Sequence, residues 1–148
     1  MSMLDLEIAK KRLSKDGLTL SIVKDGEVIF ETISHGVSGF LEAVEKFGDE
    51  LEGASVADRI VGRAVALLCV YVKLRAVYAI VLSRNAEELL EESMVHHEWK
   101  RLVENILDAN KTELCPFERL AMEISSPKGA YKRLKALQTS LRCDDEMG

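Results

Sequence analysis

Hydrophobic residues recur along the chain with two different periods, and the changes between them mark the predicted elements. The segment 4–14 spaces its apolar residues as a helix does, whereas 18–32 alternates apolar and polar residues around an Asp-Gly pair at 25–26. Asp-Gly accepts the positive φ angles of a tight turn, so this segment predicts a β-hairpin. A helix is expected from about 39 to 47, and Gly48 suits its C-terminal end.

The middle of the chain is its most apolar part. Ser55 and Asp58 stand three residues apart before a nearly continuous apolar run, which is typical of a helix N-terminus, so the pattern predicts a buried helix from Ser55 onward. Asp58, Gly62 and Ala66 would form a ridge of small residues on that helix, which lets a sheet or a ligand come near. The following run at 76–82 is a continuous stretch of residues that favour β-strands, of the type buried on both faces of a sheet, and it predicts a buried strand.

The C-terminal third is predicted to be mainly helical. Ser83 ends the buried strand and precedes a helix start at Asn85, while the segment 101–107 fits a strand or a helix almost equally well. Pro116 and Pro127 open two further helices. A hairpin, a buried helix and a buried strand followed by more helices indicate a three-layer α/β protein with a mixed central sheet.

The length of the chain fits one domain. A chain of 148 residues can bury a single core, and we expect this domain to cover 1–142, followed by a frayed acidic tail at 143–148. The longest apolar run, 64–72, is far shorter than the ~20 residues that cross a bilayer, and the N-terminus lacks the apolar centre of a signal peptide. Three widely spaced cysteines suit free thiols. We therefore expect a cytoplasmic protein without a membrane segment.

The net charge of −5 narrows the choice of partners. A protein that grips a nucleic-acid backbone concentrates Lys and Arg, so the acidic balance argues against a nucleic acid. The last helix is basic, but a solvated face explains this better than a phosphate-binding surface. A small-molecule ligand and a homo-oligomer stay open.

Cys115 raises the sharpest chemical question in the sequence. It precedes Pro116 and stands three residues before Glu118, so it fits the start of a helix. A thiolate there is favoured by the helix dipole and disfavoured by the neighbouring Glu113 and Glu118. A buried structural cysteine is the alternative.

Asp58 and Ser83 also have two readings each. Asp58 could serve as an acid or base, or could only cap its helix. Ser83 could bind a ligand at the strand end, or could only form a turn. Arg63 could hold an anionic group beside Gly62, and a solvated position is the alternative.

The triplet H-x-E at 96–98 calls for a comparison with zinc sites. Zinc deaminases combine H-x-E with P-C-x-x-C, whereas 115–118 here reads C-P-F-E and lacks the second cysteine. Three ligands cannot be assembled from this spacing, and adjacent histidines are more often exposed loop residues. We expect no metal and no other cofactor.

Five segments in order carry a resemblance: L-S-I-V-K-D-G-E-V-I-F, G-V-S-G-F-L, V-A-D-R-I-V-G-R-A-V-A-L, V-Y-A-I-V-L-S and L-C-P-F-E. Together, from about Gly17 to Leu137, they resemble an uncharacterised prokaryotic family, domain-of-unknown-function family 1893. Its fold is similar to that of the cytidine deaminases. The resemblance implies a three-layer cytidine-deaminase-like fold, with a mixed central sheet flanked by helices, that lacks the deaminase zinc motif.

The resemblance also places the candidate residues. Asp58 falls where a deaminase keeps H-x-E, and Ser83 falls where its cysteine pair would follow. Family members carry lysines where this chain has Arg59 and Arg63, so an amine nucleophile is excluded there. We predict a metal-free pocket with Cys115, Asp58 and Glu118 as candidate catalytic residues and Ser83, Arg63 and Gly62 as candidate ligand contacts.

Two functions remain in view at this point. The leading hypothesis is an enzyme that acts on a small nucleotide-like or amide-bearing molecule, with Cys115 as nucleophile and Asp58 as acid, base or orienting group. The alternative is a non-catalytic small-molecule-binding or regulatory module.

Overall fold

The computed structural model describes residues 2–15, 17–34, 36–107 and 110–147, without the side chains of 2–3 and 142–147. Its elements follow in the order α1 (Ser2–Lys15), β1 (Leu20–Lys24), β2 (Glu27–Thr32), α2 (Val37–Phe47), η1 (Gly48–Leu51), β3 (Ser55–Val61), α3 (Arg63–Tyr71), β4 (Ala76–Ser83), α4 (Arg84–Glu92), β5 (His96–Val103), α5 (Pro116–Ala121), η2 (Pro127–Gly129) and α6 (Ala130–Met147).

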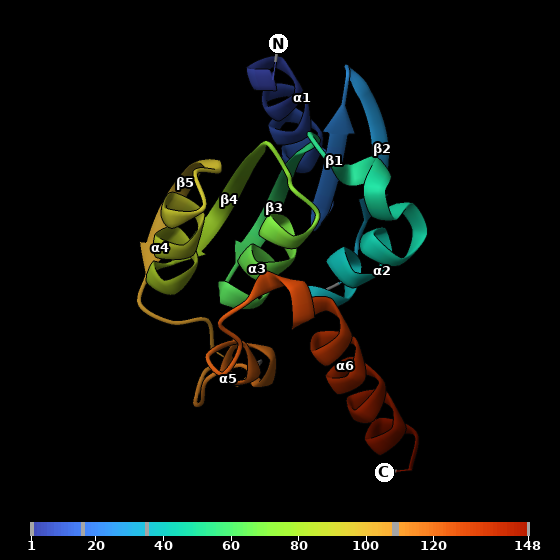
Figure 1. The fold of residues 1–148 in the computed structure, drawn as a ribbon, viewed down its shortest axis with the longest axis vertical. Helices are drawn as coiled ribbons and strands as arrows, with labels where there is room; N and C mark the ends of the chain where they lie inside the picture. The colour runs from blue at the N-terminus through green and yellow to red at the C-terminus, as the bar shows by residue number, and fades with distance from the viewer. Residues whose placement is uncertain (1, 16, 35, 108–109, 148) are drawn as a thin grey trace.

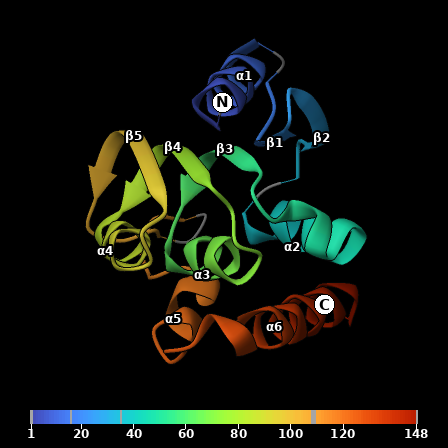
Figure 2. The same ribbon diagram turned by 45° about the horizontal axis from the view of Figure 1, so that its top comes forward.

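The five strands form one sheet in the order β2-β1-β3-β4-β5 (Figure 1). β1 is antiparallel to both β2 and β3, whereas β3, β4 and β5 run parallel. α1 covers one face of the sheet, and α2, α3 and α4 cover the other, with α5 and α6 packed outside α3 (Figure 2). The expected α/β fold, a mixed central sheet flanked by helices, is confirmed.

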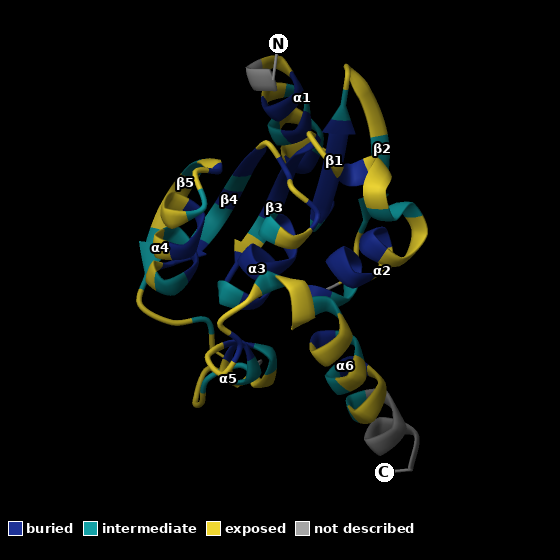
Figure 3. Ribbon diagram, viewed as in Figure 1, coloured by how far each residue is buried: buried dark blue, intermediate teal, exposed yellow. Residues whose placement is uncertain are grey.

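Two hydrophobic clusters hold these layers together, one on each face of the sheet. Buried residues, dark blue in Figure 3, run along β1, β3 and α3. The larger cluster joins the sheet to α2, α3 and α4 and contains Phe40, Leu67 and Leu82, all fully buried. The smaller cluster lies under α1 and contains Leu13 and Val23. Burying one side chain of this size contributes roughly 1.5–3 kcal/mol, so both helix layers are bound mainly by apolar contact.

The predicted hairpin is confirmed, and α1 holds its turn in place. Asp25 and Gly26 have φ angles of 52° and 81°, the positive values that suit a tight hairpin. The carboxylate of Asp5 accepts hydrogen bonds from the backbone N–H groups of both residues, at 3.0 and 2.8 Å. Further along α1, the Arg12 guanidinium donates two hydrogen bonds to Glu31 of β2, at 2.8 and 2.7 Å.

The helix expected to begin at Ser55 is the main error among the predicted elements. The segment starts as the central strand β3, and helix α3 begins only at Arg63. β3 pairs with β1 on one side and β4 on the other, so neighbouring strands satisfy its backbone. Gly62 separates the strand from the helix. Asp58, Gly62 and Ala66 therefore do not share a helix face.

Two smaller corrections concern the next elements. Ser83, rather than Asn85, is the N-cap of α4. The last strand begins at His96 and not near 101, so the two adjacent histidines belong to an edge strand and not to a loop. The buried strand expected at 76–82 is confirmed as β4.

Within the described ranges, no helix is both long and apolar enough to cross a membrane. The backbone of α6 continues to Met147. We expected an acidic tail at 143–148. The side chains of 143–147 and the whole of residue 148 lie outside the described part of the structure.

Candidate functional site

The N-terminus of α3 is closed by a carboxylate from a distant segment. Glu118 of α5 accepts a hydrogen bond from the backbone N–H of Arg63 at 2.7 Å and a second from that of Ala64 at 2.9 Å. The first N–H groups of a helix have no partner within the helix, and they attract negative charge. Glu118 therefore caps a helix that begins 55 residues earlier in the chain.

Gly62 makes this contact possible. It is the N-cap of α3, and a Cβ atom placed on it would lie 2.3 Å from Oε1 of Glu118. Real Cβ atoms essentially never come that close, and three atoms of the carboxylate would be within 2.5 Å. The absence of a side chain at Gly62 is thus what admits the Glu118 carboxylate to the helix end.

Arg63 of α3 also links α3 to α5, with its side chain as the donor. Its guanidinium donates hydrogen bonds to the carbonyl oxygens of Ala121, at 2.9 Å, and Ile124, at 2.8 Å. These carbonyls belong to the end of α5 and the turn after it, where backbone acceptors need partners. The Arg63 side chain expected to hold an anionic ligand is therefore occupied by the protein's own backbone.

Burial raises the pKa of Glu118, while the amide hydrogen bonds from Ala64 and Arg63 and the Arg63 charge oppose that rise. Glu118 is only 6% exposed. These contacts are the ones expected of a structural carboxylate locked at a helix end.

Ser83 plays a similar capping role on the neighbouring helix. Its hydroxyl accepts a hydrogen bond from the backbone N–H of Ala86 at 3.2 Å, and the side chain is buried. Ser83 and Glu118 face one crevice between the start of α4 and α5, and this crevice has no room for a water-sized molecule. The crevice is lined by Ser83, Asn85, Glu104, Asn105, Leu114, Glu118 and Met122.

Asp58 lies apart from this crevice, within β3. It pairs with Leu20 of β1 and Ala79 of β4 and is 6% exposed. Burial raises the pKa of Asp58 from 3.8 to about 7, against the opposing effect of the backbone N–H groups of Ile60 and Arg59. Adjacent residues of a strand point to opposite faces. The Arg59 side chain bonds to the carbonyl of Leu18, and among the described residues no cation pairs with the Asp58 carboxyl.

The thiol whose pKa is affected by the Asp58 charge is that of Cys69 in α3. Burial raises the pKa of Cys69, and the Asp58 charge raises it further. Cys115 is the half-buried N-cap of α5, its backbone N–H donates to the Ile106 carbonyl at 3.0 Å, and its side chain caps nothing. In the described part of the chain, no hydrogen bond joins Asp58 to Cys115.

The structure thus joins some of the predicted site residues and separates others. Gly62, Arg63 and Glu118 contact one another directly, and Ser83 shares a crevice with Glu118. Asp58 belongs to the sheet and the core.

An open pocket that the sequence did not predict lies at the carboxyl ends of the parallel strands. Ile60, Val81 and Arg101 are register partners across β3, β4 and β5. They form the floor of a pocket of about 740 Å³, which we call the carboxyl-end pocket. The segment after β5 supplies its other side. The pocket is lined by Ile60, Val81, Arg101, Val103, Glu104, Asn105, Ile106, Leu107 and Lys111.

The fold and these contacts define an α/β protein with a mixed sheet between helices. The chain belongs to the TM1506 family, described as a domain of unknown function (DUF1893), whose pattern matches residues 8–137. The family resemblance carried by the five sequence segments is therefore confirmed.

A solved structure agrees with this assignment. The chain is similar to a DUF1893 family protein (TM1506) from Thermotoga maritima, with a TM-score of 0.84 and 28% identity over 92% of this chain and 91% of that one. The chain also has a distant likeness to RibD from Acinetobacter baumannii, with a TM-score of 0.42 and 18% identity over 90% of this chain and 38% of that one. No curated protein matches the chain significantly.

The contact between Gly62 and Glu118 predicts coupled effects on stability. Gly62→Ala should displace the Glu118 carboxylate, and Glu118→Ala should remove it. Each change leaves two backbone N–H groups of α3 unsatisfied, so each should lower the free energy of unfolding by about 2–4 kcal/mol. The double variant should cost about as much as the more harmful single change. Urea denaturation measures all three, and Gly129→Ala, where an added Cβ meets no atom within 4 Å, is the matched control. Strictly additive losses would contradict the shared contact.

The buried carboxyl of Asp58 predicts a pH dependence of stability. The folded protein keeps this proton up to about pH 7, whereas the ordinary value for release is 3.8, so stability should fall as pH rises between these values. Asp58→Asn should cancel most of this fall and raise the free energy of unfolding at pH 8 by about 2–4 kcal/mol. Urea denaturation at pH 5 and pH 8 tests this. The exposed Asp49→Asn should change neither value by more than about 0.5 kcal/mol.

Proposed function

We propose that the protein is a non-catalytic module that binds a small molecule in the carboxyl-end pocket. The observation that carries this proposal is the position of the pocket, at the carboxyl ends of three parallel strands, where ligands of open α/β sheets bind. Its volume of about 740 Å³ falls in the range of ordinary ligand sites.

The side chains of the pocket indicate the chemistry of its ligand. Ile60, Val81 and Val103 offer an apolar surface, while Arg101 and Lys111 bring positive charge to the rim. Among the described residues, neither cation forms an ion pair with a carboxylate. A molecule with a flat apolar body and one anionic group, such as a nucleotide, matches both features.

The helix ends beside the pocket support binding without catalysis. Glu118 and Ser83 use their side chains to cap helices, and Arg63 uses its guanidinium on backbone carbonyls. A catalytic group must reach the reacting atom, and these three are committed to the fold. We therefore propose that they shape the neighbouring wall and do not contact the ligand.

Nucleoside monophosphates test the proposal directly. We expect at least one of a panel of five to bind with a micromolar Kd by isothermal titration calorimetry, and the double variant Arg101→Gln and Lys111→Gln to bind it at least tenfold more weakly, a loss of about 1.4 kcal/mol or more. Lys100→Gln is the matched control, since Lys100 lies beside α1 and away from the pocket. Failure of every nucleotide to bind, or wild-type affinity in the double variant, would contradict the proposal.

An enzyme is the second candidate, and Asp58 is the observation that favours it. A buried carboxyl group with a pKa of about 7 can exchange its proton near neutral pH, and such groups concentrate at catalytic sites. In this second proposal Cys115, a half-buried thiol at a helix start, is the nucleophile.

The reactivity of Cys115 separates the two candidates. We expect the wild-type protein at pH 7 to react with iodoacetamide no faster per thiol than glutathione does, because the binding module needs no activated thiolate. Cys115→Ser identifies the contribution of this residue against that of the remaining cysteines. A Cys115 rate more than about tenfold above glutathione would favour the enzyme.

A further inference from the structure

Three side chains with metal-binding atoms converge between α4 and β5, away from the carboxyl-end pocket. Glu87 and Glu91 stand one turn apart on α4, and His97 is the second residue of β5. Nε2 of His97 lies 2.8 Å from Oε2 of Glu87 and 3.6 Å from Oε2 of Glu91. All three potential ligand atoms are within 4.8 Å of one another.

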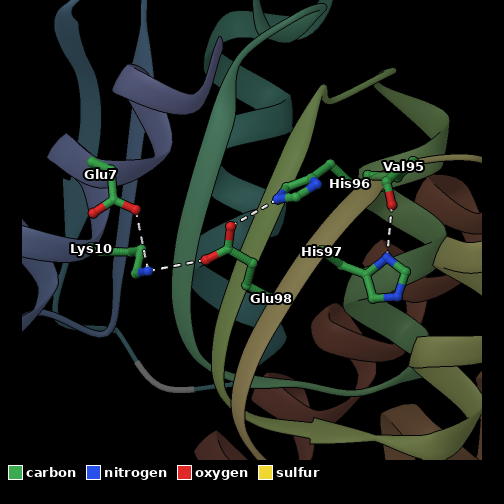
Figure 4. Close-up of polar contacts among 6 residues, drawn as sticks. All are labelled: Glu7, Lys10, Val95, His96, His97 and Glu98. Atoms are coloured by element: carbon green, nitrogen blue, oxygen red, sulfur yellow. Dashed lines mark hydrogen bonds and ion pairs between the residues drawn. The ribbon is translucent and has the colours of Figure 1, made fainter.

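The other ring nitrogen of His97 fixes the chemistry of this cluster. Nδ1 lies 2.8 Å from the carbonyl oxygen of Val95 (Figure 4). A carbonyl can only accept a hydrogen bond, so Nδ1 must carry a hydrogen. In a neutral imidazole, Nε2 then presents a lone pair to two carboxylates, which repel it. A cation at Nε2, either a proton or a metal ion, is needed to make the arrangement favourable.

The rest of the surroundings matches a metal site better than an ion pair. The His97 side chain is only 8% exposed, and a ring nitrogen bonded to a backbone carbonyl is the arrangement that orients metal-bound histidines. In the described structure, no lysine or arginine pairs with Glu87 or Glu91. Two carboxylates facing one imidazole therefore leave an excess of negative charge that a single proton does not balance.

The preceding histidine provides a natural comparison. His96 points to the opposite face of β5, where its Nε2 lies 2.8 Å from Oε2 of Glu98 (Figure 4). The Lys10 ammonium already pairs with that carboxylate at 3.0 Å, and the hydrogen bond with His96 together with that from Lys10 lowers the pKa of Glu98. Lys10 also contacts Glu7 at 3.3 Å, so two carboxylates on that face share one permanent positive charge. Among the described residues, the α4 face has no such lysine or arginine.

We propose that Glu87, Glu91 and His97 bind a divalent transition-metal ion such as zinc. Zinc takes imidazole nitrogen and carboxylate oxygen at about 2.0–2.2 Å, with ligand atoms then roughly 3.3 Å apart in a tetrahedral site. The observed separations of 2.8 and 3.6 Å bracket that value, and Glu91 is exposed and free to adjust. Imidazole disfavours calcium and magnesium, which prefer oxygen ligands alone.

This site differs from the H-x-E arrangement considered in the sequence. Its ligands come from two elements, with one histidine and two glutamates, and no cysteine takes part. Bound metal would join α4 to the edge strand β5, and it would be independent of any ligand in the carboxyl-end pocket.

The single tryptophan reports on this site. Trp99 stacks against His97 with ring centroids 5.9 Å apart. Cobalt(II), a paramagnetic substitute for zinc, should quench Trp99 fluorescence in tag-free protein with saturation at one ion per chain, and zinc should reverse the quenching. The cobalt spectrum should lack a thiolate charge-transfer band, which separates this site from binding by cysteines.

Matched variants decide the assignment. His97→Gln and Glu91→Gln should each weaken cobalt binding at least tenfold, since each removes one direct ligand. His96→Gln, on the opposite face of the same strand, should change it less than twofold. Circular dichroism checks that each variant folds, and Glu91→Gln, an exposed position, carries the test if His97→Gln does not fold. No saturable binding below millimolar cobalt, or equal losses in His96→Gln and His97→Gln, would overturn the proposal.

Discussion

The carboxylate of Glu118 at the start of α3 is the contact on which the site region depends. Its two oxygens accept hydrogen bonds from two backbone N–H groups that have no partner within the helix. The carboxylate can reach these N–H groups only because Gly62 has no side chain. Arg63 returns the interaction by binding the carbonyls at the end of α5. Each element therefore satisfies the free backbone groups of the other. A helix N-terminus that could attract an external anion is filled from within the chain.

This internal cap determines where a ligand can enter. The crevice between the start of α4 and α5 has no room for a water-sized molecule, so open space at the carboxyl ends of the strands lies further out, over Ile60, Val81 and Arg101. Residues 104–107 and Lys111 form the outer wall. The bridge between Leu107 and Leu114 and the hydrogen bond from the Cys115 amide to the Ile106 carbonyl hold Ile106 and Leu107 in place. The segment that delivers Glu118 to α3 is therefore also the one that shapes the pocket.

Local signals explain which parts of the fold could be predicted. The hairpin turn and the buried strand β4 were predicted because a few neighbouring residues determine them. β3 was not, because Ser55 and Asp58 imitate a helix start, and the two strands that flank β3 lie elsewhere in the sequence. The cap by Glu118 depends on a contact across 55 residues, and no local pattern announces it. The sequence could identify Glu118 as a polar residue near a helix start. It could not identify the N-terminus of α3 as the partner of Glu118.

The two histidines of β5 show how strand register divides chemistry between faces. Side chains alternate along a strand, so neighbours of the same type meet different surroundings. His96 faces α1, where Lys10 lies between Glu98 and Glu7. His97 faces α4, where two glutamates one helical turn apart meet an imidazole and, among the described residues, no lysine or arginine. Reading these residues as a loop hid this difference, because a loop has no fixed alternation. Assigning them to an edge strand places His97 against α4, and the charge excess follows from that placement.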